Sequence, residues 1–202
     1  GSNDIERLTA MEEEIKAMAE EWDGEVPSAI PMLPNVVELS AFYQKKGVQA
    51  MLHKLELPLA LDKETTNVVG FIPKKHGYFL IAEDTVQQSE SLTRTVLEGF
   101  KYLGDRVNKY IFNAGGRFTQ YEKDYGELID ESEYVSFLTE LSTEIDERQE
   151  HGWDIATFVY IPEAHLLNNH ILTALELFKK VLGQGARNGI YIIFQGVQRS
   201  IE

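Results

Sequence analysis

Cysteine is absent from the 202 residues, and no apolar run approaches the length of a membrane span. Without thiols the chain forms no disulfides and no thiolate metal sites, which is compatible with a reducing compartment. A spanning helix needs ~20 consecutive apolar residues, and a secretory signal needs an apolar segment near the start. The sequence has neither, so we expect a soluble, cytosolic polypeptide. Gly1-Ser2 resembles the remnant of a cleaved expression tag, and we therefore expect a longer natural chain.

Basic residues are scarce as well. The chain has 19 Lys and Arg against 33 Asp and Glu, which gives a net charge of −14. Residues 1–25 hold nine acids and two bases, and residues 124–150 hold ten acids and one base. A surface of this kind repels a phosphate backbone unless a separate basic groove is present. Direct nucleic-acid binding is therefore disfavoured, and we interpret the two acidic stretches as solvated helix faces.

The first fifty residues are interpreted as an appendage to the main domain. Apolar side chains recur at spacings of three and four, at Leu8, Met11, Ile15, Met18 and Trp22. This pattern predicts an amphipathic helix whose apolar stripe must dock on another surface. Three prolines at 27–34 then predict an extended connector, followed by a short helix near 39–46. We assign residues 1–50 to the appendage and residues 51–202 to the main domain.

The main domain alternates short apolar runs with helical patterns. The runs lie at 78–82, 109–112, 155–161 and 190–194 and show no period-two alternation. Strands that are buried on both faces have this pattern, and with helices between them they predict an α/β fold with a predominantly parallel sheet. A helix is predicted at 132–147, with Asp130 and Glu133 in capping-box spacing at its start.

In such a sheet, ligands bind at the carboxyl ends of the strands, so the loops after residues 82, 112, 161 and 194 are the places to search. The first of these loops joins a predicted strand to an amphipathic helix, "FLIAEDTVQQSESLTRTV". That local order is typical of a nucleotide triphosphate site. The loop itself, however, contains neither glycine nor lysine.

Three segments in order, the loop above, "FVYIPEAHLL" and "GQGARNGIYIIFQGVQR", carry a family resemblance. They resemble the corresponding segments of the FtsK/SpoIIIE translocase ATPases. The linking segments "LPLALD", "IFNAGGRF" and "YGELIDESEYVSFLTELSTEIDERQ" are similar to the EssC/EccC branch, the membrane ATPases of type VII secretion, and the resemblance covers roughly residues 30–202. The resemblance implies a P-loop NTPase (RecA/FtsK-like) fold with a parallel sheet flanked by helices.

The P-loop of that family has the form Gly-x-x-x-x-Gly-Lys-Ser/Thr. At the four defining positions this chain has Glu83, Gln88, Ser89 and Glu90, and the residues between are Asp84, Thr85, Val86 and Gln87. Glycines let the backbone wrap the phosphates, and the lysine supplies positive charge. A carboxylate ~4 Å from a phosphate oxygen costs about 4 kcal/mol at an effective dielectric near 20, which equals the whole free energy of a millimolar affinity. We therefore predict that ATP and Mg²⁺ are not bound and that the domain has no cofactor.

The second motif of the family, an apolar strand ending in Asp-Glu, is half lost. Pro162 replaces the aspartate that would hold magnesium, and Glu163 remains at the position of the water-polarising glutamate. We interpret Glu163 as vestigial, a carboxylate at a strand end or helix cap. Arg187 and Gln195 match the arginine and sensor positions, with Gln198 as the alternative sensor. Without a bound phosphate, we expect them to pack or to form salt bridges.

Two other signals are weaker. His165 and His170 lie five residues apart, which does not place both on one helical face, so no metal site is expected. The segment "NAGGR", residues 113–117, could form an anion nest with Arg117, but we favour a plain turn.

The resemblance and the lost motifs together predict a non-hydrolysing, degenerate ATPase domain of a type VII secretion motor. The family implies a place on the cytoplasmic side of the cell membrane, within a larger membrane protein. It implies two kinds of partner: neighbouring ATPase domains of the same chain, and small helical-hairpin secretion substrates. Two alternatives stay open, namely an active ATPase or nucleotidase completed by neighbouring domains, and a DNA translocase motor, against which the acidic charge argues.

Overall fold

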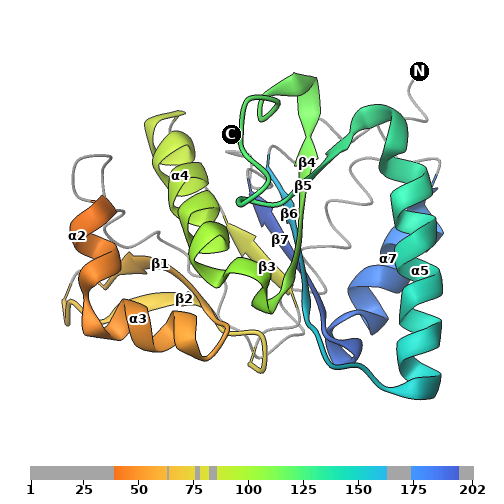
Figure 1. Cartoon of the computed structure of the whole chain (residues 1–202), viewed down its shortest axis with the longest axis horizontal. Coiled ribbons are helices and arrows are strands. Elements are labelled where there is room, and N and C mark those ends of the chain that lie inside the picture. The colour runs from red at the N-terminus through yellow and green to blue at the C-terminus, as the bar shows by residue number, and fades with distance from the viewer. Residues whose placement is uncertain (1–38, 63, 76–77, 82–85, 163–173, 196–202) are drawn as a thin grey trace, which may run out of the picture.

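The computed structural model describes residues 39–62, 64–75, 78–81, 86–162 and 174–195, and its centre is a five-stranded parallel sheet. Its strands are β3 (Tyr78–Ile81), β4 (Asn108–Asn113), β5 (Glu127–Asp130), β6 (Thr157–Ile161) and β7 (Ile190–Gln195). Their order across the sheet is β3-β7-β6-β4-β5, and every neighbouring pair is parallel. Helices cover both faces (Figure 1). The predicted parallel α/β fold is therefore confirmed.

The strands alternate between two apolar cores, one on each face of the sheet. In β6, Val159 and Ile161 pack with helices α5 (Tyr134–His151) and α7 (Leu175–Gln184). Phe158 and Tyr160 point to the other face, where α4 (Val86–Leu103) lies. Because both faces are buried, the strand shows no alternation of apolar and polar residues, as the sequence pattern predicted.

The segment before the sheet packs on the α4 face. It consists of α2 (Leu39–Gln44), α3 (Lys46–His53) and an antiparallel hairpin of β1 (Leu57–Leu61) and β2 (Val68–Phe71). The Phe71 ring lies 5.9 Å from the rings of both Phe158 and Tyr191, so the hairpin joins the core of the sheet. Phe42 and Tyr43, which the sequence analysis placed in the appendage, belong to the same buried cluster. The predicted helix at 1–25 and the proline connector lie outside the described residues.

The four predicted strands are found within three residues of their expected ends, but β5 was missed. Of its four residues only Ile129 is buried, because β5 lies at the edge of the sheet. It therefore has no apolar run that would predict a strand.

The predicted helix at 132–147 corresponds to α5, yet the capping box does not form. A 3-10 turn, η3 (Glu131–Glu133), precedes α5, and neither Asp130 nor Glu133 makes a side-chain cap hydrogen bond.

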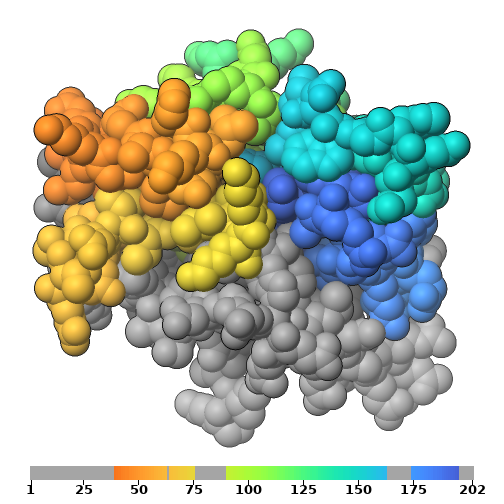
Figure 2. Space-filling view, turned by 90° about the horizontal axis from the view of Figure 1, so that it is seen from below, coloured from red at the N-terminus to blue at the C-terminus, as the bar shows by residue number. Residues whose placement is uncertain are grey.

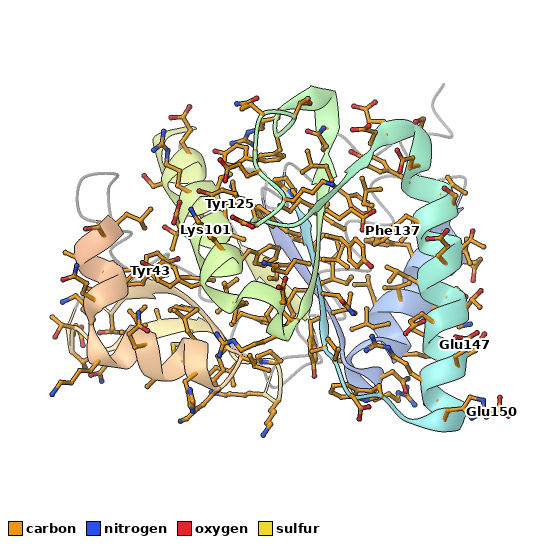
Figure 3. The ribbon with its side chains drawn as sticks, in the orientation of Figure 1. Tyr43, Lys101, Tyr125, Phe137, Glu147 and Glu150 are labelled. Carbon is orange, nitrogen blue, oxygen red and sulfur yellow. The ribbon has the colours of Figure 1, made fainter. Side chains whose placement is uncertain are left out.

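Half of the ten acids in the stretch 124–150 belong to α5, and the other half precede that helix. Phe137 is buried against the sheet, whereas Glu147 and Glu150 are exposed and point away from it (Figure 3). Lys180 of α7 reaches Asp146 at 2.8 Å and so pairs one of these acids. None of the helices in the described ranges is long and apolar enough to cross a membrane.

Candidate functional site

All five parallel strands end at the carboxyl edge of the sheet, where β3, β7 and β6 lie side by side. Because β7 lies between the other two, its last residue, Gln195, is flanked by the connections that follow β3 and β6. Residues 82–85 and 163–173 of these connections lie outside the described part of the chain. This edge is where parallel α/β sheets bind ligands, and most of the predicted site residues belong to it.

Gln195 is fully buried, with 0% of its surface exposed, and is held in a polar network. Its Nε2 donates to the Thr93 hydroxyl at 2.9 Å, and the Tyr160 hydroxyl donates to its Oε1. Thr93 belongs to the second turn of α4, and Tyr160 is the fourth residue of β6. The network therefore joins α4, β6 and β7 just below the carboxyl edge. Both polar ends of the Gln195 amide are bonded within the protein.

A second set of contacts fixes the loop after β4 and ends on the same network. The Asn113 side chain donates to Asp130 Oδ1 at 3.0 Å and to the Thr119 hydroxyl at 3.2 Å. Arg117 follows in this loop, and its Nη2 lies 3.3 Å from the Thr93 hydroxyl. Its guanidinium also lies 5.1 Å from the centre of the Phe118 ring. The Arg117 guanidinium therefore lies near α4, where it contacts the Thr93 hydroxyl and the Phe118 ring.

The glycine pair of the "NAGGR" segment forms a 3-10 turn, η2 (Ala114–Gly116). Gly115 and Gly116 have φ values of 63° and 71°, a left-handed conformation that side chains disfavour. The Gly115 amide donates to Glu131 Oε1 at 2.9 Å. The donor that a bound anion would use is therefore taken by a carboxylate of this chain. This geometry agrees with the interpretation as a structural turn.

The structure brings together only part of the predicted site. Four of the predicted residues form the first turn of α4, namely Val86, Gln87, Gln88 and Ser89. Glu90 follows them and is exposed, and Pro162 is buried directly after β6. Glu83, Asp84, Thr85, Glu163 and the alternative sensor Gln198 lie outside the described residues, as do His165 and His170.

Arg187 lies at the opposite end of the sheet. It belongs to the 3-10 turn η6 (Ala186–Asn188), which precedes β7, whereas Gln195 ends that strand. At ~3.3 Å per residue, the six residues of β7 separate the two ends by roughly 17 Å. Arg187 is exposed and donates to the Gly183 carbonyl at 3.2 Å. It therefore takes no part in the network around Gln195.

Thr93 and Tyr160 were not singled out in the sequence, although each leaves a signal there. Thr93 lies beside Leu92 and three residues before Val96 on the buried side of α4, so it is a polar residue within an apolar stripe. Tyr160 is a hydroxyl-bearing residue inside the apolar run of β6. Buried polar side chains of this kind need hydrogen-bond partners, and here the Tyr160 hydroxyl donates to the Thr93 hydroxyl.

Burial raises the pKa of the Tyr134 hydroxyl above its ordinary value, and the nearby carboxylates of Glu131 and Asp130 raise it further, so this group is neutral near pH 7. The described ranges contain no cluster of three His, Asp or Glu residues that could hold a metal ion.

Comparison with known proteins finds a similarity to a bacterial secretion component in both sequence and fold. No protein-family model matches the sequence. The chain is 22% identical to the type VII secretion system protein EssC of Staphylococcus aureus strain MSSA476 over 203 aligned residues, and 21% identical to that of strain NCTC 8325. A solved structure described as the cytoplasmic domain of EssC matches the fold with a TM-score of 0.53 and 14% identity, and covers 91% of this chain and 38% of that one.

The sequence similarity is distant homology to EssC, and it extends over 94% of this chain. The chain spans only 13% of the length of the curated relatives it matches. The structural match shows the fold alone, an α/β domain with a parallel sheet flanked by helices.

Proposed function

We propose that this chain is a non-hydrolysing, degenerate ATPase domain of a type VII secretion motor, which acts by binding in substrate recognition or motor assembly. The distant homology to EssC supports the secretion context. The parallel sheet with α4 directly after β3 is compatible with a P-loop NTPase (RecA/FtsK-like) fold. In this proposal the domain lies on the cytoplasmic side of the cell membrane, as part of a larger membrane protein.

The observation that carries the loss of catalysis is the burial of Gln195. A sensor residue has to turn its amide toward a bound phosphate, but here Nε2 and Oε1 are bonded to Thr93 and Tyr160. Breaking these two buried bonds costs about 1–3 kcal/mol. The loop before α4 also lacks the glycines and the lysine that would hold a phosphate. Both features act against nucleotide binding at the same edge of the sheet.

Calorimetric titration with Mg-ATP and Mg-ADP tests this proposal directly. We expect no saturable heat at millimolar nucleotide. Micromolar binding would overturn the degenerate assignment and favour the alternative of an ATPase or nucleotidase completed by neighbouring domains. An electrophoretic shift of duplex DNA at low salt would instead favour the translocase alternative, against which the net charge of −14 argues.

A restored loop provides a sharper test of where the defect lies. The variant Glu83→Gly, Val86→Gly, Gln88→Gly and Ser89→Lys regains the family's two glycines and its lysine and adds a third glycine between them. We expect no ATP turnover from it, because Pro162 still takes the place of the magnesium aspartate. Separately, Glu163→Gln in the parent domain should leave partner binding unchanged. Measurable turnover in the restored variant would show that the loop alone was the defect.

Partner binding is tested with the tagged domain in cells. We expect it to recover motor subunits, namely neighbouring ATPase domains, or small helical-hairpin secretion substrates. Deleting residues 3–23 should reduce this recovery more than it reduces thermal stability, because the predicted apolar stripe in that segment needs a docking surface. A domain that recovers neither class and hydrolyses a nucleotide by itself would refute the proposed function.

A further inference from the structure

The turn between α7 and β7 forms a rigid support at the amino edge of the sheet. Asn188 is buried, and its Nδ2 donates to the Gln184 carbonyl at 3.0 Å and to Gln149 Oε1 at 3.2 Å. Gly189 follows with a φ of 73°, and a Cβ added to it would lie 2.6 Å from the Trp153 ring. The ring therefore packs directly on the backbone of this turn.

A buried arginine fixes the same region from α5. Arg148 is only 7% exposed, and its guanidinium donates to the Asn188 carbonyl at 2.9 Å and to the Thr157 hydroxyl at 3.0 Å. It also lies 5.8 Å from the centre of the Trp153 ring. The turn, the start of β6 and the end of α5 are thus held together, and Trp153 contacts two parts of this unit.

Two large apolar side chains stay exposed on this support. Trp153 is 41% exposed and Ile155 is 49% exposed. Because they are two positions apart along the chain, their Cα atoms are separated by no more than ~8 Å. Figure 2 looks onto this end of the molecule, where the end of α5 and the start of β7 lie side by side. Exposed tryptophan held on an ordered backbone is typical of the residues that contribute most to protein contacts.

The charges near these two side chains are acidic, and most of them are unpaired. Residues 144–155 contain five acids and a single Lys or Arg. Two of the acids pair with Arg148 and Lys180. The other three are exposed and make no ion pair with a Lys or Arg of the described ranges, namely Glu147, Glu150 and Asp154.

These three carboxylates lie close enough to act on whatever covers the tryptophan. Glu147 and Glu150 are one turn apart near the end of α5 and both point away from the sheet (Figure 3). Along the chain, the Cα of Glu150 lies at most ~11 Å from that of Trp153, and the Cα of Asp154 lies ~4 Å from it. These separations are comparable with the Debye length of about 8–10 Å at moderate salt.

The acidic charge selects the kind of partner that can cover Trp153 and Ile155. Nucleic acid or an anionic membrane would bring phosphates toward three unpaired carboxylates. A second copy of this chain would bring a net charge of −14, and residues 1–25 hold nine acids against two bases. All of these are repelled, whereas a protein segment with Lys or Arg beside apolar side chains is attracted by both the carboxylates and the apolar surface.

We propose that this surface, the Trp153 patch, is a docking site for a basic segment of another protein, in which Lys or Arg residues flank apolar side chains. The apolar side chains of the partner cover Trp153 and Ile155, and its cations pair with Glu147, Glu150 and Asp154. Because the backbone beneath is already ordered, little conformational entropy is lost on binding. The inference rests on the proposed function for the idea that the domain acts by binding, and it adds the chemistry of the partner and the edge where it docks.

Trp153 itself reports whether the patch is occupied. The chain has two tryptophans, so Trp153 is the only emitter in the Trp22→Phe chain. The probe is a synthetic amphipathic helix of leucine and lysine, and its matched control has glutamate in place of every lysine. We expect the lysine peptide to move the emission to shorter wavelength and to reduce acrylamide quenching in a saturable manner. The glutamate peptide should change neither.

Charge reversal separates the patch from the overall acidity of the chain. Glu147→Lys combined with Glu150→Lys should weaken binding of the lysine peptide about tenfold, because two attractions are lost and replaced by repulsion. The matched control reverses two exposed acids elsewhere, Glu127→Lys with Glu133→Lys, and changes the net charge by the same amount. It should weaken binding less than about twofold, because charges beyond a Debye length are screened.

A second pair of variants tests the apolar part of the contact. Ile155→Ser should weaken binding of the lysine peptide about fivefold, because the apolar area that the peptide covers is lost. Val135→Ser is the matched control, since Val135 is an exposed apolar residue in the first turn of α5, at the other end of that helix. It should leave the affinity unchanged.

Three results would overturn the proposal. Equal weakening by the two charge-reversed pairs would mean that the peptide responds only to net charge. Saturable binding of the lysine peptide that leaves Trp153 emission and quenching unchanged would place the contact elsewhere. Protection of Trp153 that rises with protein concentration in the absence of peptide would identify a second copy as the occupant. None of these readouts involves a nucleotide, so Mg-ATP binding would refute the proposed function and leave them unaffected.

Discussion

Replacing the buried arginine of α5 tests how the amino edge is held together. The Arg148 guanidinium makes hydrogen bonds to the Asn188 carbonyl, the Thr157 hydroxyl and Glu144, and a longer one of 3.4 Å to the Gly189 carbonyl. Arg148→Met keeps the length of the side chain and removes all of these donors. Glu144 is half exposed and regains water, but the Asn188 and Thr157 acceptors stay buried.

The expected loss follows from those two acceptors. A hydrogen bond to a charged group contributes about 1.5–3 kcal/mol, so losing two of them should lower the free energy of unfolding by about 3–6 kcal/mol. For a chain of this size, each 1 kcal/mol corresponds to about 2–4 °C in Tm. Urea unfolding followed by circular dichroism measures this directly, and the slope m should not change because the surface exposed on unfolding stays the same.

Arg187→Met is the matched control, because this arginine lies in the adjoining turn but is exposed. Its effect should stay within about 0.5 kcal/mol, as is usual for surface substitutions. An Arg148→Met variant that loses less than about 1 kcal/mol would refute the reasoning. It would show that water enters the site and replaces the lost donors, and hence that the turn is not rigid.

Three further predictions concern other parts of the fold. Gly70→Ala should destabilise the β1–β2 hairpin by roughly 1–3 kcal/mol in thermal unfolding, because its Cβ would lie 2.1 Å from the Leu57 carbonyl oxygen. Its contrasting variant is Gly183→Ala, where a Cβ meets nothing within 4 Å. This variant should stabilise α7 by about 0.5–1 kcal/mol in the same measurement. Burial and a carboxylate partner raise the pKa of Tyr125 from 10.0 to about 12. The folded state favours its neutral form, so this contribution to stability should be constant below pH 10 and disappear between pH 10 and about 12, and phenolate absorbance that titrates at 10 in the folded protein would contradict it. Tyr160→Phe should lower the free energy of unfolding by about 1–3 kcal/mol, because it removes a hydroxyl from a fully buried network, and an effect below about 0.5 kcal/mol would show that the network contributes little.

The parallel sheet could be predicted because burial on both faces leaves a simple pattern in the sequence. The runs that became β6 and β7 are almost wholly apolar and buried, whereas the run that became β4 contains Lys109 beside its apolar residues. β5 could not be predicted in the same way. An edge strand buries few side chains, and the sequence "ELID" shows only one buried position.

The candidate site was predictable in part, for a different reason. The position of Gln195 followed from its place at the end of an apolar run, since carboxyl ends of parallel strands meet at one edge. Its partners did not follow, because Thr93 is 102 positions away along the chain and Tyr160 is 35 positions away. Arg187 was grouped with Gln195 by the family resemblance, but its position before β7 places it at the other edge.

The two edges of the sheet differ in what a binding partner would have to displace. At the carboxyl edge an anion would compete with Glu131 for the Gly115 amide, and with Thr93 for Arg117, so binding there starts by breaking existing hydrogen bonds. At the amino edge, Trp153 in the connection after α5 and Arg187 in the turn η6 are exposed. A partner that meets side chains on a preorganised backbone loses little conformational entropy, and tryptophan has only two side-chain torsions to restrict. In the proposed function, where the domain acts by binding, this difference favours the amino edge over the carboxyl edge for contact with a partner.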